Sequence, residues 1–295
     1  MAGDPSDWIT IGSTRLSATI DPLGAQLSSL RDADGRQLQW QGNPAVWAGR
    51  APILFPIVGM LVDGQYRTGG QTFCLPRHGF ARVRRFMLTA TGCASATFGL
   101  TADAQTLAVY PFQFALDVCF AIQDRTLSVT SWIRNCGERD MPASLGYHPA
   151  FAWPLPYGQD RATHFIEFEA DEPAPMRVLD GNGLLKPQSQ ASAIQNRRLA
   201  LRDELFRADA LIFDQIVSRR VTYGSEGGPR IAISFPGIPY LGVWTKPGAN
   251  FICIEPWQGV TDPEGFNGEL QDKPGVLIIP PGKAVAVAME ITLLP

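Results

Sequence analysis

The stretch FQFALDVCFAI (112–122) alternates large apolar side chains with small or polar ones. The large side chains occupy every second position, namely Phe112, Phe114, Leu116, Val118 and Phe120. Successive side chains of a β-strand point to opposite faces, so this period of two is typical of a strand with one buried face. The stretch therefore predicts a β-strand that packs one side on a hydrophobic core.

The same pattern recurs along the whole chain of 295 residues, in segments rich in β-branched and aromatic residues. These segments are LSATI (16–20), TLSVTSWI (126–133), RIAISF (230–235), YLGVWT (240–245), NFICIE (250–255) and AVAVAMEITL (284–293). Turn-forming residues separate them, because the chain contains 29 Gly and 24 Pro. Many short strands without intervening helices predict an all-β fold, a large antiparallel β-sandwich.

Little of the chain favours another structure. Residues 202–213 (RDELFRADALIF) are the best helical candidate, and the Pro- and Gly-rich residues 173–192 predict a long surface loop. Strand patterns resume after this loop without a change in composition. Hydrophobic residues make up 45% of the chain, enough for one sizeable core, so we expect a single domain over residues 1–295.

The chain has a net charge of −3 and no concentrated patch of basic residues. Nucleic acids and anionic membranes require such a patch, so neither is an expected partner. The apolar run 51–62 contains two prolines and is shorter than the about 20 residues that cross a bilayer. The opening residues MAGDPSDW lack the basic and apolar regions of a secretory signal, which favours a cytoplasmic protein. Five cysteines without a C-x-x-C pair are interpreted as reduced core residues.

Three apolar segments contain ionisable residues that a plain core does not select: LPRHGFAR (75–82), SLGYHPAF (144–151) and FICIEPWQG (251–259). Taken singly, His78 reads as a turn residue, His148 as a satisfied core histidine and Glu255 as an ion-paired carboxylate. Taken together, His148 and Glu255 each precede a proline, which holds both backbones near the extended region. A partly desolvated carboxylate and an imidazole suit an acid–base pair.

Aromatic residues beside these segments indicate the class of ligand. Tyr147, Phe151, Trp153 and Trp257 offer flat apolar faces, against which the C–H groups of a sugar can pack. Sugar hydroxyls also need charged or amide partners. The candidates for that role are Arg50, Arg82, Asp209 and His78.

Other chemistries have weaker support. Metal binding competes for His78, His148, His164 and Glu255, but no local pair has ligand spacing, so we expect no metal site. Phosphate-binding loops, dinucleotide fingerprints and the G-x-S-x-G motif are missing, so we expect no cofactor and no serine nucleophile. A two-carboxylate glycosidase stays open, with Glu255 and one of Asp209, Asp214 or Asp262.

The ordered motifs HGFAR (78–82), GYHPAF (146–151) and IEPWQG (254–259) resemble the aldose 1-epimerase (galactose mutarotase-like) family, in the branch near the hexose-6-phosphate 1-epimerases. APILFPIVG (51–59) and DALIF (209–213) extend the resemblance. It implies a β-supersandwich and a reaction without cofactor. In such enzymes a glutamate removes the anomeric hydroxyl proton, a histidine protonates the ring oxygen, and the opened sugar rotates about C1–C2 before it recloses. Glu255 matches that base, and His148 matches that acid.

By the same resemblance, His78 and Asp209 hold sugar hydroxyls, and Arg82 holds a hydroxyl or a phosphate. Two departures concern the substrate. Met60 stands where relatives often have the arginine of VGR, so Arg50 is a candidate replacement, and Ala152 stands where relatives often have asparagine.

The resulting expectation is an aldose 1-epimerase for a small-molecule sugar, acting as a monomer or a homodimer. Its catalytic residues are Glu255 and His148, and its substrate-binding residues are His78, Arg82, Asp209, Arg50 and Trp257. A hexose-6-phosphate 1-epimerase and a carbohydrate-binding protein without turnover are the alternatives.

Overall fold

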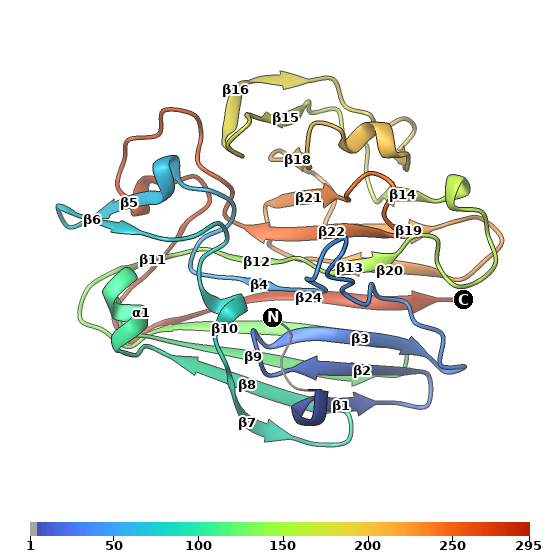
Figure 1. Cartoon of the computed structure of the whole chain (residues 1–295), viewed down its shortest axis with the longest axis horizontal. Helices are drawn as coiled ribbons and strands as arrows, with labels where there is room; N and C mark the ends of the chain where they lie inside the picture. The colour runs from blue at the N-terminus through green and yellow to red at the C-terminus, as the bar shows by residue number, and fades with distance from the viewer. Residues whose placement is uncertain (1–4) are drawn as a thin grey trace.

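The computed structural model describes residues 5–295, and nearly all of its regular structure is antiparallel β-sheet (Figure 1). The largest sheet has nine strands in the order β17 (Arg198–Ala200), β14 (Phe165–Phe168), β19 (Arg220–Gly224), β20 (Arg230–Ser234), β24 (Ala284–Leu294), β10 (Thr126–Asn135), β9 (Phe114–Gln123), β8 (Ser95–Thr101) and β7 (Met87–Thr91).

A second sheet of eight strands carries most of the features discussed below. Its order is β16 (Leu185–Gln190), β15 (Met176–Leu179), β18 (Leu211–Phe213), β21 (Tyr240–Trp244), β22 (Phe251–Gln258), β12 (Leu145–Tyr147) and β4 (Ile53–Leu54), while β13 (Ala150–Ala152) also pairs with β22.

The remaining elements are short. A three-stranded sheet contains β1 (Ile9–Gly12), β2 (Leu16–Asp21) and β3 (Gln26–Asp32); the two-stranded sheets are β5 (Gln65–Thr68) with β6 (Gln71–Cys74) and β11 (Met141–Ala143) with β23 (Leu277–Ile279). The one α-helix among residues 5–295 is α1 (Ala104–Val109), and six 3₁₀ turns cover Pro5–Asp7, Val62–Gly64, Ala81–Val83, Arg161–Thr163, Asp203–Phe206 and Leu270–Asp272. No helix in this described range is long and apolar enough to span a membrane.

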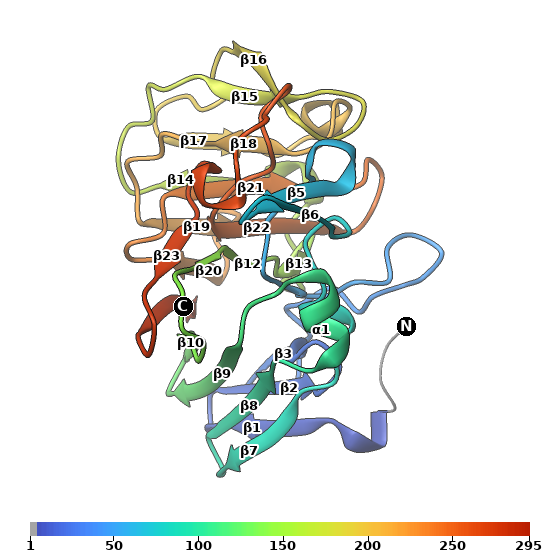
Figure 2. The same cartoon turned by 90° about the vertical axis from the view of Figure 1, so that its left-hand side faces the viewer.

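One hydrophobic core joins the sheets, which confirms the predicted all-β sandwich. It contains the inward residues of β9 together with Ile252 and Ile254 of β22. The Tyr147 hydroxyl of β12 donates to the carbonyl oxygen of Val287 in β24 at 2.7 Å, and so ties the eight-stranded sheet to the nine-stranded one. Figure 2 shows the layers from the side.

The segment that opened the sequence analysis forms β9, and its buried and half-buried residues alternate as predicted from Phe114 to Ile122. Strands also form in the six other predicted segments, as β2, β10, β20, β21, β22 and β24. The expectation holds because each strand buries one face against the shared core.

Two predicted elements are wrong. Residues 202–213 form a single 3₁₀ turn and then strand β18, because the chain reverses at Asp209, whose φ is 81°. Residues 173–192 contain the hairpin of β15 and β16 rather than a loop. Its turn is stabilised by Asp180 Oδ1, which accepts from the backbone N–H groups of Asn182 and Leu184.

The interpretation of the cysteines as core residues holds only for Cys253. All five are free; Cys119 is half-buried, and Cys74, Cys93 and Cys136 are exposed. The exposed three lie at strand ends or in turns, where the apolar pattern of the neighbouring strand no longer implies burial.

Candidate active site

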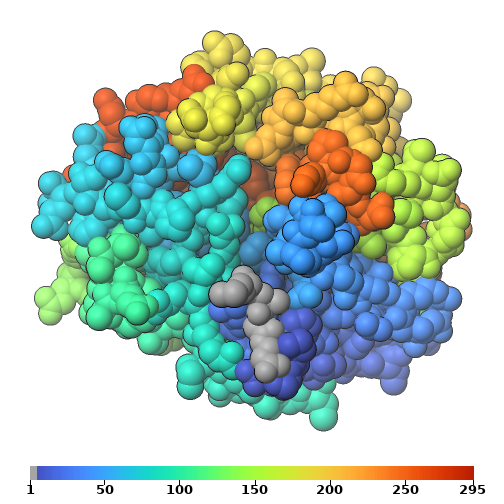
Figure 3. All heavy atoms as spheres, in the orientation of Figure 1, coloured from blue at the N-terminus to red at the C-terminus, as the bar shows by residue number. Residues whose placement is uncertain are grey.

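A cavity of about 160 Å³ lies over the face of the eight-stranded sheet, closed at its sides by residues of segments 47–59, 77–82 and 179–183. Figure 3 shows a hollow on this side of the molecule, between the cyan segment that contains 77–82 and the yellow and orange segments. Six of the seven predicted site residues line this cavity: Glu255, His148, His78, Arg82, Asp209 and Trp257.

Strand register brings Glu255 and His148 together at the floor. In β22, Ile252 and Ile254 face the core, so the alternating positions Cys253, Glu255 and Trp257 face the other way. Gly146 pairs with Trp257 and Ala150 pairs with Cys253, and His148, which lies between those two partners in the chain, falls opposite Glu255.

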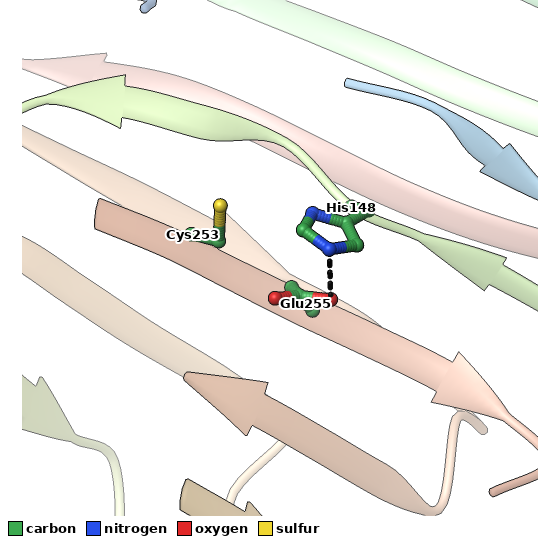
Figure 4. A group of neighbouring side chains, drawn as sticks. All are labelled: His148, Cys253 and Glu255. Carbon is green, nitrogen blue, oxygen red and sulfur yellow. Dashed lines mark ion pairs between the residues drawn. The ribbon is translucent and has the colours of Figure 1, made fainter. Parts of the chain in front are cut away.

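The two side chains are in direct contact. His148 Nε2 lies 3.1 Å from Glu255 Oε2 (Figure 4), and the residues are only 8% and 1% exposed. Among residues 5–295, neither Glu255 Oε2 nor His148 Nδ1 has a well-aligned hydrogen-bond partner. Buried polar atoms are nearly always satisfied in folded proteins, so these atoms are available to a ligand.

Burial moves the two pKa values in opposite directions. Desolvation raises the pKa of Glu255 well above its ordinary value and lowers the pKa of His148 to about 3, with Arg82 and Arg77 as smaller causes of the His148 shift. Burial therefore favours the neutral form of each residue, the acid of Glu255 beside the free base of His148. A pair of this kind can accept a proton at one atom while it donates one from the other.

His78 is held as a hydrogen-bond donor toward the cavity. The backbone N–H of Gly59 donates to His78 Nδ1 at 3.0 Å, and burial lowers the pKa of His78 well below its ordinary value. A neutral ring whose Nδ1 accepts must carry its proton on Nε2. The backbone turns sharply after His78, and this turn requires glycine at position 79, where φ is 70°. A Cβ at Gly79 would lie only 2.2 Å from the Phe55 carbonyl oxygen.

Charged groups surround the mouth of the cavity. Arg82 Nη2 donates to the Arg77 carbonyl oxygen at 2.9 Å, and burial lowers the pKa of Arg82. Arg77 Nη2 lies 3.6 Å from Asp209 Oδ2, and both of these side chains are partly exposed. The sequence analysis missed Arg77, although it directly precedes His78 in the quoted motif.

Arg50 does not line the cavity, so the structure does not bring this predicted substrate-binding residue together with the other six. Its Nε donates to the Gln41 carbonyl oxygen at 2.8 Å, and its guanidinium stacks over Trp8. The side chain near Met60 is instead Arg77: a Cβ on Gly183 would lie 3.2 Å from Met60 Cγ and 3.3 Å from Arg77 Nη2. Arg77 therefore places a guanidinium near Met60, the position where relatives often have the arginine of VGR.

Trp257 is positioned by two glycines. A Cβ on Gly242 would lie 2.4 Å from the Trp257 ring, and a Cβ on Gly146 would lie 2.8 Å from it, so the indole occupies the space that these strands leave open. Trp257 Nε1 makes no well-aligned hydrogen bond among residues 5–295, but its interaction with the Glu255 carboxyl lowers the pKa of that group, against the larger effect of burial. The ring therefore presents an apolar face at the floor, with its N–H beside Glu255.

The other predicted aromatic faces are core residues. Tyr147, Phe151 and Trp153 are fully buried away from the cavity, which corrects the expectation for all three. The walls are instead Trp47 and Trp244. Trp47 stacks on the His148 ring with centroids 5.2 Å apart. Trp244 lies on the same face of its strand as Gly242, so the alternation of the strand could have predicted its direction. Trp47 lies in an irregular loop, where no such alternation exists.

Two of the three carboxylates proposed as the glycosidase partner of Glu255 lie outside the cavity. Asp214 pairs with Arg177 at 2.7 Å, Asp262 pairs with the buried Lys273, and neither lines the cavity. His164 is also structural, because its Nε2 accepts from the Leu155 N–H at 3.1 Å. Of the three candidate partners for Glu255, only Asp209 reaches the cavity.

The raised pKa of Glu255 has a consequence for stability. Because burial raises the folded-state pKa of Glu255 above its ordinary value of 4.5, folding must return a proton to this residue at pH values between 4.5 and the raised pKa. That cost grows by about 1.4 kcal/mol per pH unit until the raised pKa is reached. Glu255→Gln removes it, so the stability advantage of the variant over the wild type is expected to grow from pH 5 to pH 8 in urea unfolding. An advantage that is constant or shrinks with pH would contradict the raised pKa.

Known proteins resemble this chain over nearly its whole length. The family model described as aldose 1-epimerase matches residues 7–269. The chromosomal protein LacX of Lactococcus lactis subsp. lactis is 33% identical over 97% of this chain and 99% of its own.

Two solved structures are also similar over nearly their whole length. A galactose mutarotase related enzyme from Lactobacillus acidophilus has a TM-score of 0.90 and 28% identity, with 98% of this chain and 97% of that one covered. A galactose mutarotase-like protein from Lactobacillus casei has a TM-score of 0.89 and 29% identity, with 97% and 99% covered. From the match of the family model over most of its length, the chain belongs to the aldose 1-epimerase family.

Proposed function

We propose that the protein is an aldose 1-epimerase that interconverts the α and β anomers of a free hexose or a related sugar. The observation that carries the proposal is the contact of Glu255 and His148 at the floor of a small cavity. Cavities for drug-sized ligands usually measure about 300–1,000 Å³, and the volume of about 160 Å³ here suits a single sugar ring better than an oligosaccharide.

The proposed reaction moves protons only between oxygen and the two side chains. In the tautomer with a carboxylate and an imidazolium, Glu255 takes the proton of the anomeric hydroxyl while His148 gives its proton to the ring oxygen. The bond between C1 and the ring oxygen breaks, and the electron pair of the former O–H bond completes the aldehyde. Rotation about C1–C2 exposes the other face of the carbonyl.

Reclosure reverses these transfers. The ring hydroxyl attacks C1 and returns its proton to His148, while Glu255 returns its proton to the carbonyl oxygen. Each side chain ends as it began, so no net proton, electron or water is consumed. General acid–base catalysis of about 10²–10⁴-fold is adequate for a reaction that water itself performs slowly.

The other cavity residues have complementary parts in this proposal. His78 donates from Nε2 to a hydroxyl oxygen, and Asp209 accepts from a hydroxyl at the mouth. Arg82 and Arg77 donate to further oxygens, and Trp257 packs under the C–H face of the ring. Their sugar contacts are proposed from the cavity lining and the donor states described above.

The charges at the mouth favour a free sugar over a hexose 6-phosphate. Asp209 lies beside Arg77, so a phosphate that approached Arg77 would also meet a carboxylate. Arg50, which the phosphosugar alternative needs as a second cation, is turned toward Gln41 and Trp8. We therefore place free aldoses first.

A panel of freshly dissolved sugars tests the proposal by polarimetry. Free hexoses, pentoses and hexose 6-phosphates are each followed with and without the protein. Acceleration with at least one free aldose is the expected result. Acceleration only with phosphosugars would replace the substrate class, and saturable binding without any acceleration would show a carbohydrate-binding protein instead.

Arg77 and Arg50 make a matched pair of substitutions. Arg77→Ala is expected to raise KM by about 10–100-fold, because a hydrogen bond to a charged group contributes about 1.5–3 kcal/mol. Arg50→Ala is expected to leave KM unchanged. Both are measured with the best sugar of the panel. Equal effects of the two substitutions, or an effect of Arg50→Ala alone, would contradict the assignment of Arg77 to the cavity.

A further inference from the structure

A third side chain accompanies the acid–base pair and has no part in the proposed reaction. Cys253 is completely buried, two residues before Glu255 on the same face of β22. Figure 4 shows its Sγ on the side of the strand where the His148 ring also lies. One ligand atom from each of His148, Cys253 and Glu255 lies within 4.8 Å of the others.

We propose that this floor is also a binding site for a thiophilic divalent cation such as Zn²⁺, held by His148, Cys253 and Glu255 in competition with the sugar. The competition rests on the proposed function, because the cation would occupy the atoms that serve there as base and acid. Binding of the cation itself does not depend on the proposed function.

The donor set carries the chemical argument. Imidazole nitrogen, thiolate sulfur and carboxylate oxygen are the three ligand types of protein zinc sites, at about 2.0–2.3 Å from the ion. The three donor atoms lie within 4.8 Å of one another, so side-chain rotations can bring them to a central cation. The backbones that carry them need not move, because strand pairing holds β22 beside β13. His148 and Glu255 line the cavity, so a fourth position for water remains on that side.

A second observation points to a ligand independently of this spacing. Glu255 Oε2 is buried and has no well-aligned donor among residues 5–295, although it lies at ion-pair distance from His148 and the carboxyl group also interacts with the Trp257 indole. A cation at the centre of the group would satisfy that oxygen. When the sulfur–metal bond forms, the proton of the Cys253 thiol leaves to solvent, as metal binding by cysteine requires.

The surroundings favour selectivity for a thiophilic ion. Cys253 packs in a small apolar cluster with Ala150, Ala249 and Phe251, against which Trp47 and Trp244 lie. A hard cation such as Mg²⁺ prefers an all-oxygen, hydrated site, whereas this group offers a single carboxylate beside a sulfur and an imidazole nitrogen.

The test is a titration with Co²⁺, because a cobalt–thiolate bond gives a charge-transfer absorption band. The exposed thiols are first removed as C74A/C93A/C136A, and that variant serves as the reference. Cys253→Ala is then compared with Cys119→Ala, a matched change of the other strand cysteine, and Cys253→Ser serves if alanine impairs folding. The band is expected in the reference and with Cys119→Ala, and absent with either Cys253 variant. No band in the reference, or a band that survives in both Cys253 variants, would overturn the proposal.

A second readout separates this inference from the proposed function. Zn²⁺ is expected to inhibit mutarotation at least tenfold more weakly in Cys253→Ala than in the reference, while both have the same rate without metal. Equal inhibition of the two proteins would overturn the assignment of Cys253. If no sugar is turned over, the cobalt band alone decides the metal site, so the two proposals fail separately.

Discussion

Glu255→Gln is expected to slow the anomer exchange by about 10²–10⁴-fold, the usual contribution of a general base, without loss of the fold. The amide has the shape of the carboxyl group but cannot take the anomeric proton. The measurement is kcat/KM by polarimetry with the sugar that the wild type uses best. Glu172→Gln is the matched control, because Glu172 is also buried but accepts from Val217 and Ser218 backbone N–H groups outside the cavity.

His148→Ala is expected to give a loss of similar size. Because one proton passes between the two residues, the double variant with Glu255→Gln should be little worse than either single variant. Losses that multiply fully would show that the residues act independently. Wild-type rates in both single variants would refute the acid–base assignment.

Lys273→Met is expected to destabilise the protein by about 3–5 kcal/mol, the usual cost of removing one partner from a buried ion pair. Lys273 Nζ contacts Asp262 Oδ1, and the two side chains are 0% and 2% exposed. Asp262 Oδ2 also accepts from the Val62 N–H at 3.0 Å. The substitution therefore leaves a buried carboxylate without its cation, and urea unfolding measures the loss.

A paired substitution checks the cause of that loss. Asp262→Asn with Lys273→Met removes both charges and keeps an acceptor for the Val62 N–H, so most of the stability should return. A loss below about 1 kcal/mol from Lys273→Met alone would mean that the pair behaves like an exposed one. The pair also supports the cavity, because the neighbouring Thr261 hydroxyl donates to the Gly183 carbonyl oxygen at 2.7 Å.

The strands could be predicted because a strand with one buried face has apolar residues at every second position of the sequence. The hairpin at 173–192 could not, because its strands are short, β16 is largely exposed, and Pro187 interrupts the alternation. The segment 202–213 was misread because an apolar run this short fits a turn followed by a strand as well as a helix.

The candidate site was predicted only in part, for a different reason. The contact of His148 with Glu255 depends on the pairing of β22 with β12 and β13, a long-range register that no local pattern specifies. The motifs and their resemblance to a family pointed to the residues, but not to their distance. The place of Arg50 outside the cavity could not be predicted, because its direction follows from the loop contact with Gln41, which the sequence does not reveal.

The central claim is that Glu255 and His148 open and reclose a sugar ring by moving only oxygen-bound protons. NMR exchange spectroscopy of an equilibrated aldose in D₂O tests it most directly, with wild type and Glu255→Gln at equal concentration. The account predicts fast transfer of the C1–H signal between the two anomers with the wild type, slow transfer with the variant, and no deuterium at C1 or C2. Equal transfer rates for both proteins, or deuterium at carbon, would contradict it.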